Sequence, residues 1–207
     1  DVDKGKEANK KLLCDQFNLD SDKPLFIFIG RLVGEKAADV LPDAILSSFY
    51  SFGDKVNFLI LGSGESHVEW QLSQLKHSFP GRYNAVIGYN EKLSHLMYSG
   101  ADFLLMPSRV EPCGLNQMYA MQYGTVPVVR DTGGLRDTVV DMGDFQGWGI
   151  RFNYATVGDI TYSIWRGIDL YHENKEHLSW MRKRMMEIDN SWENAVQQYL
   201  NLYSSLR

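Results

Sequence analysis

The chain has 207 residues, of which 44% are hydrophobic, so it is long enough to bury the core of one large domain. Its formal net charge is −5, and the absence of any run of lysine and arginine argues against a general role on nucleic acid or on a membrane surface. Cys14 and Cys113 lie in unrelated contexts, which indicates neither a disulfide framework nor a metal site. We expect a reduced, cytoplasmic protein, and we expect the sequence to begin inside a longer one because it opens with neither methionine nor a signal peptide.

Short apolar runs alternate with amphipathic stretches over most of the chain. The predicted strands are Leu25 to Ile29, Phe58 to Leu61, Ala85 to Ile87, Phe103 to Met106 and Val126 to Val129. Such alternation is typical of βαβ units, and strands that are apolar throughout need helices on both faces of the sheet. The predicted fold class is therefore α/β, a doubly wound, Rossmann-like parallel sheet in a single domain spanning residues 1–207.

Helical periodicity fills the intervals between these strands and takes over completely from Asp159. We predict helices around Cys14, near Ala37 to Tyr50, and at Ile160 to Tyr171, Glu176 to Ile188 and Trp192 to Leu206. The last helix carries an apolar stripe that needs a partner surface, formed by Val196, Tyr199, Leu200 and Tyr203. The tryptophans Trp165 and Trp180 and the neighbouring Met181 are expected to pack between helices rather than to form platforms for sugars. The histidines fall on charged helical stretches, where solvated faces explain them.

The segment from Pro107 to Gln117 is the most informative stretch. It places Glu111 on a tight turn after an apolar strand, and Leu115, Met118 and Met121 then recur at helical spacing. A helix N-terminus offers unpaired N–H groups that suit the hydroxyl and phosphate oxygens of a ligand. A crossover turn with a solvated glutamate is the plainer alternative. We favour ligand binding, because functional residues concentrate on loops at strand ends.

Two cations, Arg31 and Lys36, follow the first strand in the segment Gly30–Lys36. They lie where doubly wound sheets bind ligands, and an arginine can bridge two oxygens of a diphosphate while a lysine adds a point charge. If this segment is considered alone, the better interpretation is that Arg31 and Lys36 are surface residues that pair with Glu35 or Asp39.

A second glycine-containing loop, Arg130 to Leu135, follows the fifth strand. Its Gly133 and Gly134 would let the backbone approach a ligand closely, although they are equally consistent with an ordinary turn. The segment Gly62–Glu65 resembles the opening of a dinucleotide fingerprint but has no third glycine. A complete fingerprint would follow the first strand, so a dinucleotide oxidoreductase is disfavoured.

In their order and spacing, four segments resemble the C-terminal half of a bacterial glycogen or starch synthase. They are Arg31 to Lys36, Gly88 to Glu91, Pro107 to Gln117 and Thr132 to Leu135. The resemblance covers nearly the whole chain. It implies the nucleotide-sugar-binding half of a retaining glycosyltransferase of the GT-B fold, which transfers glucose from ADP-glucose, or sometimes UDP-glucose, to an α-1,4-glucan.

The same resemblance implies further parts of the molecule. The family's N-terminal half, which carries most of the acceptor site, does not appear in this sequence. The terminal helix, residues 191–207, is expected to cross to that domain. The implied partners are the sugar donor, the glucan acceptor and the N-terminal domain, with no nucleic acid and no membrane.

Carried over position by position, the resemblance assigns catalytic roles to Arg31, Lys36 and Glu111. The two cations would neutralise the departing diphosphate, and Glu111 would meet the donor glucose and steady positive charge on its ring. No metal and no other cofactor is implied. Glu35 and Ala37 replace the Gln and Gly that usually flank the lysine, and Tyr119 stands where many related transferases have a second glutamate.

The remaining positions are implied to hold the donor. Tyr89 would stack on the base. The N–H groups of Cys113 and Gly114 would hold sugar hydroxyls, Leu115 and Asn116 would meet phosphate or ribose, and Thr132 and Gly133 belong to the family's second glycine loop. Two other functions stay open: a nucleotide-sugar-binding fragment without catalysis, and a related GT-B transferase with another acceptor. The isolated chain is expected to be inactive.

Overall fold

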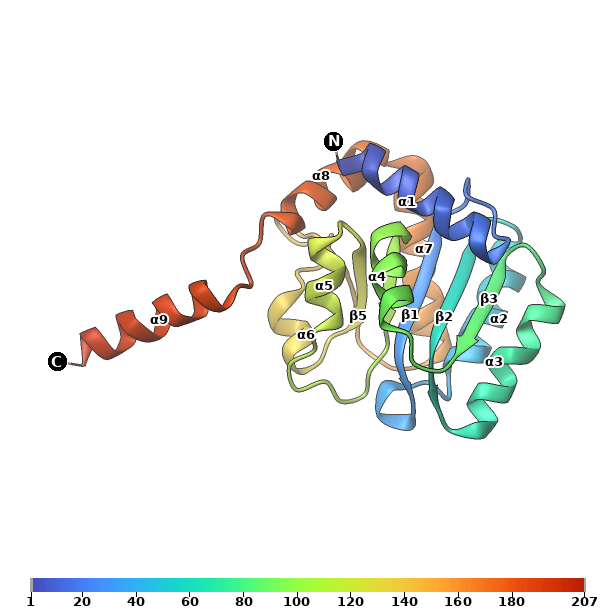
Figure 1. Cartoon of the computed structure of the whole chain (residues 1–207), viewed down its shortest axis with the longest axis horizontal. Coiled ribbons are helices and arrows are strands. Elements are labelled where there is room, and N and C mark those ends of the chain that lie inside the picture. The colour runs from blue at the N-terminus through green and yellow to red at the C-terminus, as the bar shows by residue number, and fades with distance from the viewer. Residues whose placement is uncertain (1, 207) are drawn as a thin grey trace.

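The computed structural model describes residues 2–206. Strands and helices alternate through most of this range and give way to helices at its end (Figure 1). The strands are β1 (Leu25–Leu32), β2 (Asn57–Gly64), β3 (Tyr83–Ile87), β4 (Phe103–Met106), β5 (Val126–Arg130) and β6 (Ile150–Phe152). The helices are α1 (Val2–Phe17), the 3₁₀ turn η1 (Gly34–Lys36), α2 (Leu41–Phe52), α3 (Ser66–Ser78), α4 (Glu91–Gly100), α5 (Asn116–Gln122), α6 (Gly133–Thr138), α7 (Val157–Glu173), α8 (Lys175–Met186) and α9 (Trp192–Ser205).

Within the described residues the strands form one six-stranded parallel sheet in the order β3-β2-β1-β4-β5-β6. The order reverses between β1 and β4, which makes this the switch point of a doubly wound sheet. The predicted fold class is confirmed. The expectation of five strands was wrong by one, because β6 is a short Ile-Arg-Phe segment in which Arg151 interrupts the apolar pattern.

Alternate residues of the strands face two separate hydrophobic layers, as period-two geometry requires. Phe26 and Phe28 join the layer beneath α2, α3 and α7, whereas Leu25 and Ile27 join the layer beneath α1, α4 and α6. Gly167 lets α7 lie close to the sheet, because a Cβ atom there would come within 2.7 Å of the Phe26 ring. These two layers form the core and fix the edge at which the loops after the strands meet.

Two boundaries near the first loop differ from expectation. Strand β1 continues to Leu32 because it pairs with β2 along its whole length, so Arg31 lies in the strand and not in a loop after it. The helix expected from Ala37 begins only at Leu41. The turn η1 precedes it, and Ala37 takes a left-handed φ of 53°, which interrupts the helical pattern.

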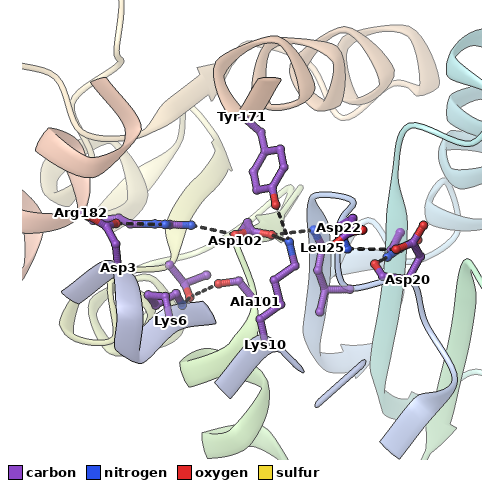
Figure 2. Close-up of polar contacts among 12 residues, drawn as sticks. Asp3, Lys6, Lys10, Asp20, Asp22, Leu25, Ala101, Asp102, Tyr171 and Arg182 are labelled. Carbon is purple, nitrogen blue, oxygen red and sulfur yellow. Dashed lines mark hydrogen bonds and ion pairs between the residues drawn. The ribbon is translucent and has the colours of Figure 1, made fainter. Parts of the chain in front are cut away.

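A buried cluster of charges joins α1 and α8 to the opposite, amino-terminal edge of the sheet (Figure 2). The carboxylate of Asp102 lies 2.7 Å from Lys10 Nζ and 2.7 Å from Arg182 Nη2, and it accepts a hydrogen bond from the Leu25 amide. Burial alone would raise the pKa of Asp102, but the two cations outweigh that effect and hold the pKa below its usual range. The cluster is a polar anchor for both helices.

Helix α9 projects away from the rest of the chain (Figure 1), and none of its residues, all within the described range, is buried. Its predicted stripe is open to solvent, with Val196, Tyr199, Leu200 and Tyr203 between 52% and 62% exposed. No helix among the described residues is long and apolar enough to cross a membrane.

Candidate functional site

The loops that follow β1 and β4 meet at the switch point of the sheet. The first carries Lys36 at the end of η1, and the second carries Glu111 between β4 and α5. The Lys36 ammonium donates a hydrogen bond to Glu111 Oε2, although the two residues are 75 positions apart. The structure therefore brings together two of the three residues predicted to be catalytic, at the place where doubly wound sheets bind ligands.

Glu111 is buried, with only 8% of its surface exposed. Its Oε2 atom also accepts a hydrogen bond from Ser108 Oγ at 3.1 Å. A buried carboxylate needs such partners because losing its water is costly. Glu111 is thus held in one position by a cation and a hydroxyl, and the alternative of a solvated glutamate on a crossover turn was wrong.

Arg31, the third predicted catalytic residue, points elsewhere. Its guanidinium lies 3.1 Å from the Glu35 carboxylate, and both side chains are about two-thirds exposed, at 67% and 65%. The alternative interpretation of these cations, a surface pair with Glu35 or Asp39, is therefore correct for Arg31. It is wrong for Lys36, which pairs with Glu111. A diphosphate bound here would have to compete with Glu35 for the guanidinium.

Sequence reasoning missed the residues that hold the Glu111 loop in place. Arg109 makes a bidentate contact with Asp39, at 2.6 and 2.8 Å, and donates to the Gly34 carbonyl at 2.7 Å. Arg130 donates from Nε to the Ser108 carbonyl at 2.7 Å. The only signal in the sequence was their position just beyond β4 and at the end of β5. Arg109 therefore ties the Glu111 loop to the segment around Lys36, and Arg130 holds the backbone of the Glu111 loop.

The turn after Glu111 presents backbone N–H groups as predicted. Within the described part of the chain, the amides of Cys113, Gly114 and Leu115 donate no hydrogen bond. Gly114 has a left-handed φ of 74°, which only glycine adopts readily, and the Gln117 side chain donates to the carbonyls of Cys113 and Gly114 at 3.0 Å. The carbonyls of the turn are held by Gln117, whereas its amides have no hydrogen-bond acceptor within the described residues.

Asn116 begins α5, and its side-chain amide is already engaged. It donates to the Ile29 carbonyl at 2.7 Å and so ties the start of α5 to β1. This contact leaves the side-chain oxygen and the backbone of the first helical turn as the groups that Asn116 can offer. The position predicted to meet phosphate or ribose thus also links the two loops of the crevice.

The second glycine loop packs against the turn that carries Glu111. Thr132 caps α6, Gly133 has a left-handed φ of 44°, and a Cβ atom there would lie 2.2 Å from the Glu111 carbonyl oxygen. At Gly134 a Cβ atom would lie 2.1 Å from the Cys113 carbonyl oxygen. These glycines therefore let the backbone approach the Glu111 loop of the protein closely, and their approach to a ligand stays a prediction.

A pocket of about 510 Å³ opens beside these loops at the carboxyl ends of β1, β2 and β3. Arg31, Tyr89, Asn116 and Tyr119 line it. Tyr89 is 87% exposed, so it is not a core residue. The pocket joins an exposed aromatic ring to a cation over a volume that suits a small ligand. No group of three or more His, Cys, Asp or Glu side chains within residues 2–206 is arranged to hold a metal ion.

The sequence and the fold correspond to a known class of enzymes. Residues 9–157 match the family model described as "Glycosyl transferases group 1", so the chain belongs to that family. It is 54% identical over 200 residues to a glycogen synthase of Flavobacterium johnsoniae, a match that covers 97% of this chain and 42% of the relative. It is 41% identical to a glycogen synthase of Rhodospirillum rubrum, covering 98% of this chain and 41% of the relative.

Among solved structures, the chain is similar to the catalytic domain of Starch Synthase IV from Arabidopsis thaliana bound to ADP and acarbose. The TM-score is 0.87 at 33% sequence identity, over 97% of this chain and 42% of that one. The chain thus spans less than half the length of each of these three proteins. The resemblance of the sequence to glycogen and starch synthases is confirmed.

Proposed function

We propose that the full protein containing this chain is a hexosyltransferase that transfers glucose from ADP-glucose to the non-reducing end of an α-1,4-glucan, with retention of configuration. The observation that carries the proposal is the pairing of Lys36 with Glu111 at the switch point, beside a pocket lined by Arg31 and Tyr89. Membership of the family and the similarity to glycogen synthases support it.

In this proposal the pocket of about 510 Å³ holds the donor nucleotide. The base stacks on the exposed Tyr89 ring, because an exposed aromatic face pairs well with a planar base. The ribose and phosphates extend toward Asn116 and the glycine loop at Thr132 and Gly133. The free amides of Cys113 to Leu115 then meet the phosphate oxygens and the hydroxyls of the glucose.

The chemistry divides between the cations and the carboxylate. As the bond between glucose C1 and the diphosphate oxygen breaks, negative charge grows on the diphosphate, and Arg31 and Lys36 neutralise it. The acceptor hydroxyl oxygen bonds to C1, and its proton is released with the nucleoside diphosphate. Glu111 stabilises the positive charge on the sugar ring. One charge pair at about 4 Å is worth about 4 kcal/mol at an effective dielectric of 20, so two cations lower the barrier substantially.

We propose that this chemistry needs no metal ion, because the cations do the work that a bound metal does in other phosphate-transfer sites. The test is to assay the full-length enzyme in excess chelator. Undiminished activity is the expected result. Activity that is lost, and that returns on addition of magnesium or manganese, would contradict the assignment of charge neutralisation to Arg31 and Lys36.

The acceptor site belongs, in this proposal, to an N-terminal domain of the same full-length protein, located in the cytoplasm. Supporting this division, the matched relatives are more than twice as long as the chain. Helix α9 crosses to that domain and covers its apolar stripe there. Holding the acceptor against the donor can supply roughly 7–11 kcal/mol of the barrier, so the chain by itself is expected to bind nucleotide and transfer no glucose.

The experiment separates donor binding from transfer. The 207-residue chain is titrated with ADP and with UDP by calorimetry, and glucan extension is then assayed with and without the separately expressed N-terminal half. We expect ADP to bind, and extension to require both halves. Failure to bind either nucleotide would refute the donor pocket. Robust extension by the chain alone would refute the division between two domains.

A further inference from the structure

Gln117 lies beneath the turn that follows Glu111 and is fully buried in the first turn of α5. Its Nε2 atom donates to the carbonyl oxygens of Cys113 and Gly114, each at 3.0 Å, and to Thr138 Oγ1 at 3.1 Å. A Cβ atom on Gly114 would come within 2.5 Å of Gln117 Oε1, so the side-chain amide lies directly against the backbone of the turn. One buried side chain thus holds two successive carbonyls.

The carbonyl just before these two is held from a different loop. Pro112 accepts a hydrogen bond from the Gly134 amide at 3.2 Å. The peptide bonds of the turn are trans, so the carbonyl and the N–H of each peptide group point in opposite directions. The N–H groups of Cys113, Gly114 and Leu115 therefore point away from the donors that hold the turn. They meet no acceptor among the described residues, and Cys113 and Leu115 are exposed.

The oxygen of the Gln117 side chain shows that packing alone does not account for this residue. Oε1 is buried and has no hydrogen-bond partner in the described part of the chain. A buried, unpaired carbonyl oxygen destabilises a fold, and an apolar side chain of the same length would fill this space without one. What the glutamine supplies, and an apolar residue cannot, is the NH₂ group that binds the two carbonyls.

We propose that Gln117 is a positioning residue, which holds the N–H groups of Gly114 and Leu115 toward the second phosphate and the glucose of the donor. This role rests on the proposed function, which assigns these amides to the donor. The peptide groups around Gly114 can rotate, because glycine allows both signs of φ. Holding the two carbonyls from beneath prevents a rotation that would turn a carbonyl oxygen toward the phosphate. Donors fixed in advance then bind an anion without the cost of ordering them.

The test is calorimetric titration of the 207-residue chain with ADP-glucose and with AMP, which lacks the second phosphate and the glucose. Gln117→Met keeps the length of the side chain and removes its hydrogen-bond donors. We expect ADP-glucose to bind this variant about tenfold more weakly or worse, while the affinity for AMP changes by less than about twofold. Gln122→Met is the matched control and should change neither affinity, because Gln122 lies on the same helix and donates to the distant Ile188 carbonyl.

NMR of the backbone amides gives a second readout, and its first part needs no variant. In the wild-type chain, ADP-glucose should shift the signals of Gly114 and Leu115 more than AMP does. In Gln117→Met these two shifts should shrink. The Cys113 signal should still respond in the variant, because the Gly134 amide holds its peptide group.

Three results would overturn the proposal. They are an unchanged ADP-glucose affinity in Gln117→Met, an equal loss of affinity for AMP and ADP-glucose, which is what a purely structural role predicts, and wild-type signals of Gly114 and Leu115 that do not respond to bound ADP-glucose. If Gln117→Met does not fold, the wild-type NMR titration alone decides. A wild-type chain that binds neither ADP nor ADP-glucose would instead refute the donor pocket of the proposed function.

Discussion

Replacing Glu35 by glutamine should strengthen donor binding. Glu35 holds the Arg31 guanidinium at 3.1 Å and adds a negative charge beside the proposed diphosphate site. In water, a pair of unit charges at this distance is worth about 1 kcal/mol, and measured values for exposed pairs run from about 0.2 to 1 kcal/mol. Both side chains are about two-thirds exposed, so the lower, solvent-screened range applies. Glu35→Gln frees the guanidinium and should tighten ADP binding roughly 1.5- to 5-fold.

The assay is calorimetric titration of ADP into the wild-type chain and the variant at low salt, repeated at high salt, where the difference should shrink because exposed charges are screened. Asp15→Asn is a matched control, because Asp15 forms an equally spaced and equally exposed pair with Lys11 at 2.9 Å on α1, far from the crevice. An unchanged or weaker affinity in Glu35→Gln would refute the competition between Glu35 and the diphosphate. A gain of the same size in Asp15→Asn would show that net charge alone is responsible.

In the full-length enzyme, Arg31→Ala and Lys36→Ala should each lower turnover by about two to three orders of magnitude, and near-normal turnover would remove that residue from the mechanism. Calorimetric melting should show that only Lys36→Ala costs appreciable stability, because it leaves the buried Glu111 without its cation whereas Arg31 is exposed. Glu111→Gln should lower kcat at saturating donor; a raised KM with unchanged kcat would instead reject charge stabilisation. Burial alone would raise the pKa of Asp141, but the hydrogen bonds from Arg166 and from the Arg151 and Gly143 amides, together with the Arg166 charge, outweigh this and hold the pKa below its usual range. This stabilisation is therefore present at neutral pH and is lost as the pH falls below about 4. Asp141→Asn should therefore lower the melting temperature at pH 7 and converge with wild type in acid; a gap that persists in acid would contradict the linkage.

The fold was predictable because its signals are local. Apolar runs of three to five residues mark β1 to β5, and the alternation with amphipathic stretches indicates a doubly wound sheet. The sixth strand, Ile150–Phe152, was missed because Arg151 interrupts it and leaves no continuous apolar run. The end of β1 was misplaced because its pairing with β2 continues past the glycine at position 30. Strand ends depend on the neighbouring strand, which a single sequence does not reveal.

The sequence indicated that Lys36 and Glu111 lie at the carboxyl edge of the sheet, but it did not indicate that they contact each other. Glu111 and Lys36 stood out as charged residues just beyond strands, yet their contact depends on two loops meeting 75 residues apart in the sequence. From the sequence, Asp39 was a possible partner for Arg31 or Lys36. In the structure it pairs with Arg109 instead. Which carboxylate pairs with each cation depends on the geometry of the loops. The spacing of residues in the sequence therefore could not predict these pairs.

The two edges of the sheet should respond differently to ionic strength. The Asp102 pairs with Lys10 and Arg182 have side chains no more than 9% exposed, so dissolved ions cannot come between their charges. The Arg31–Glu35 pair at the other edge lies in water, where the screening length falls from about 10 Å at 0.1 M salt to about 3 Å at 1 M. Salt should therefore act on the entrance to the proposed donor pocket while the anchorage of α1 and α8 stays intact. The ionic medium would then tune the affinity for a ligand without loosening the fold.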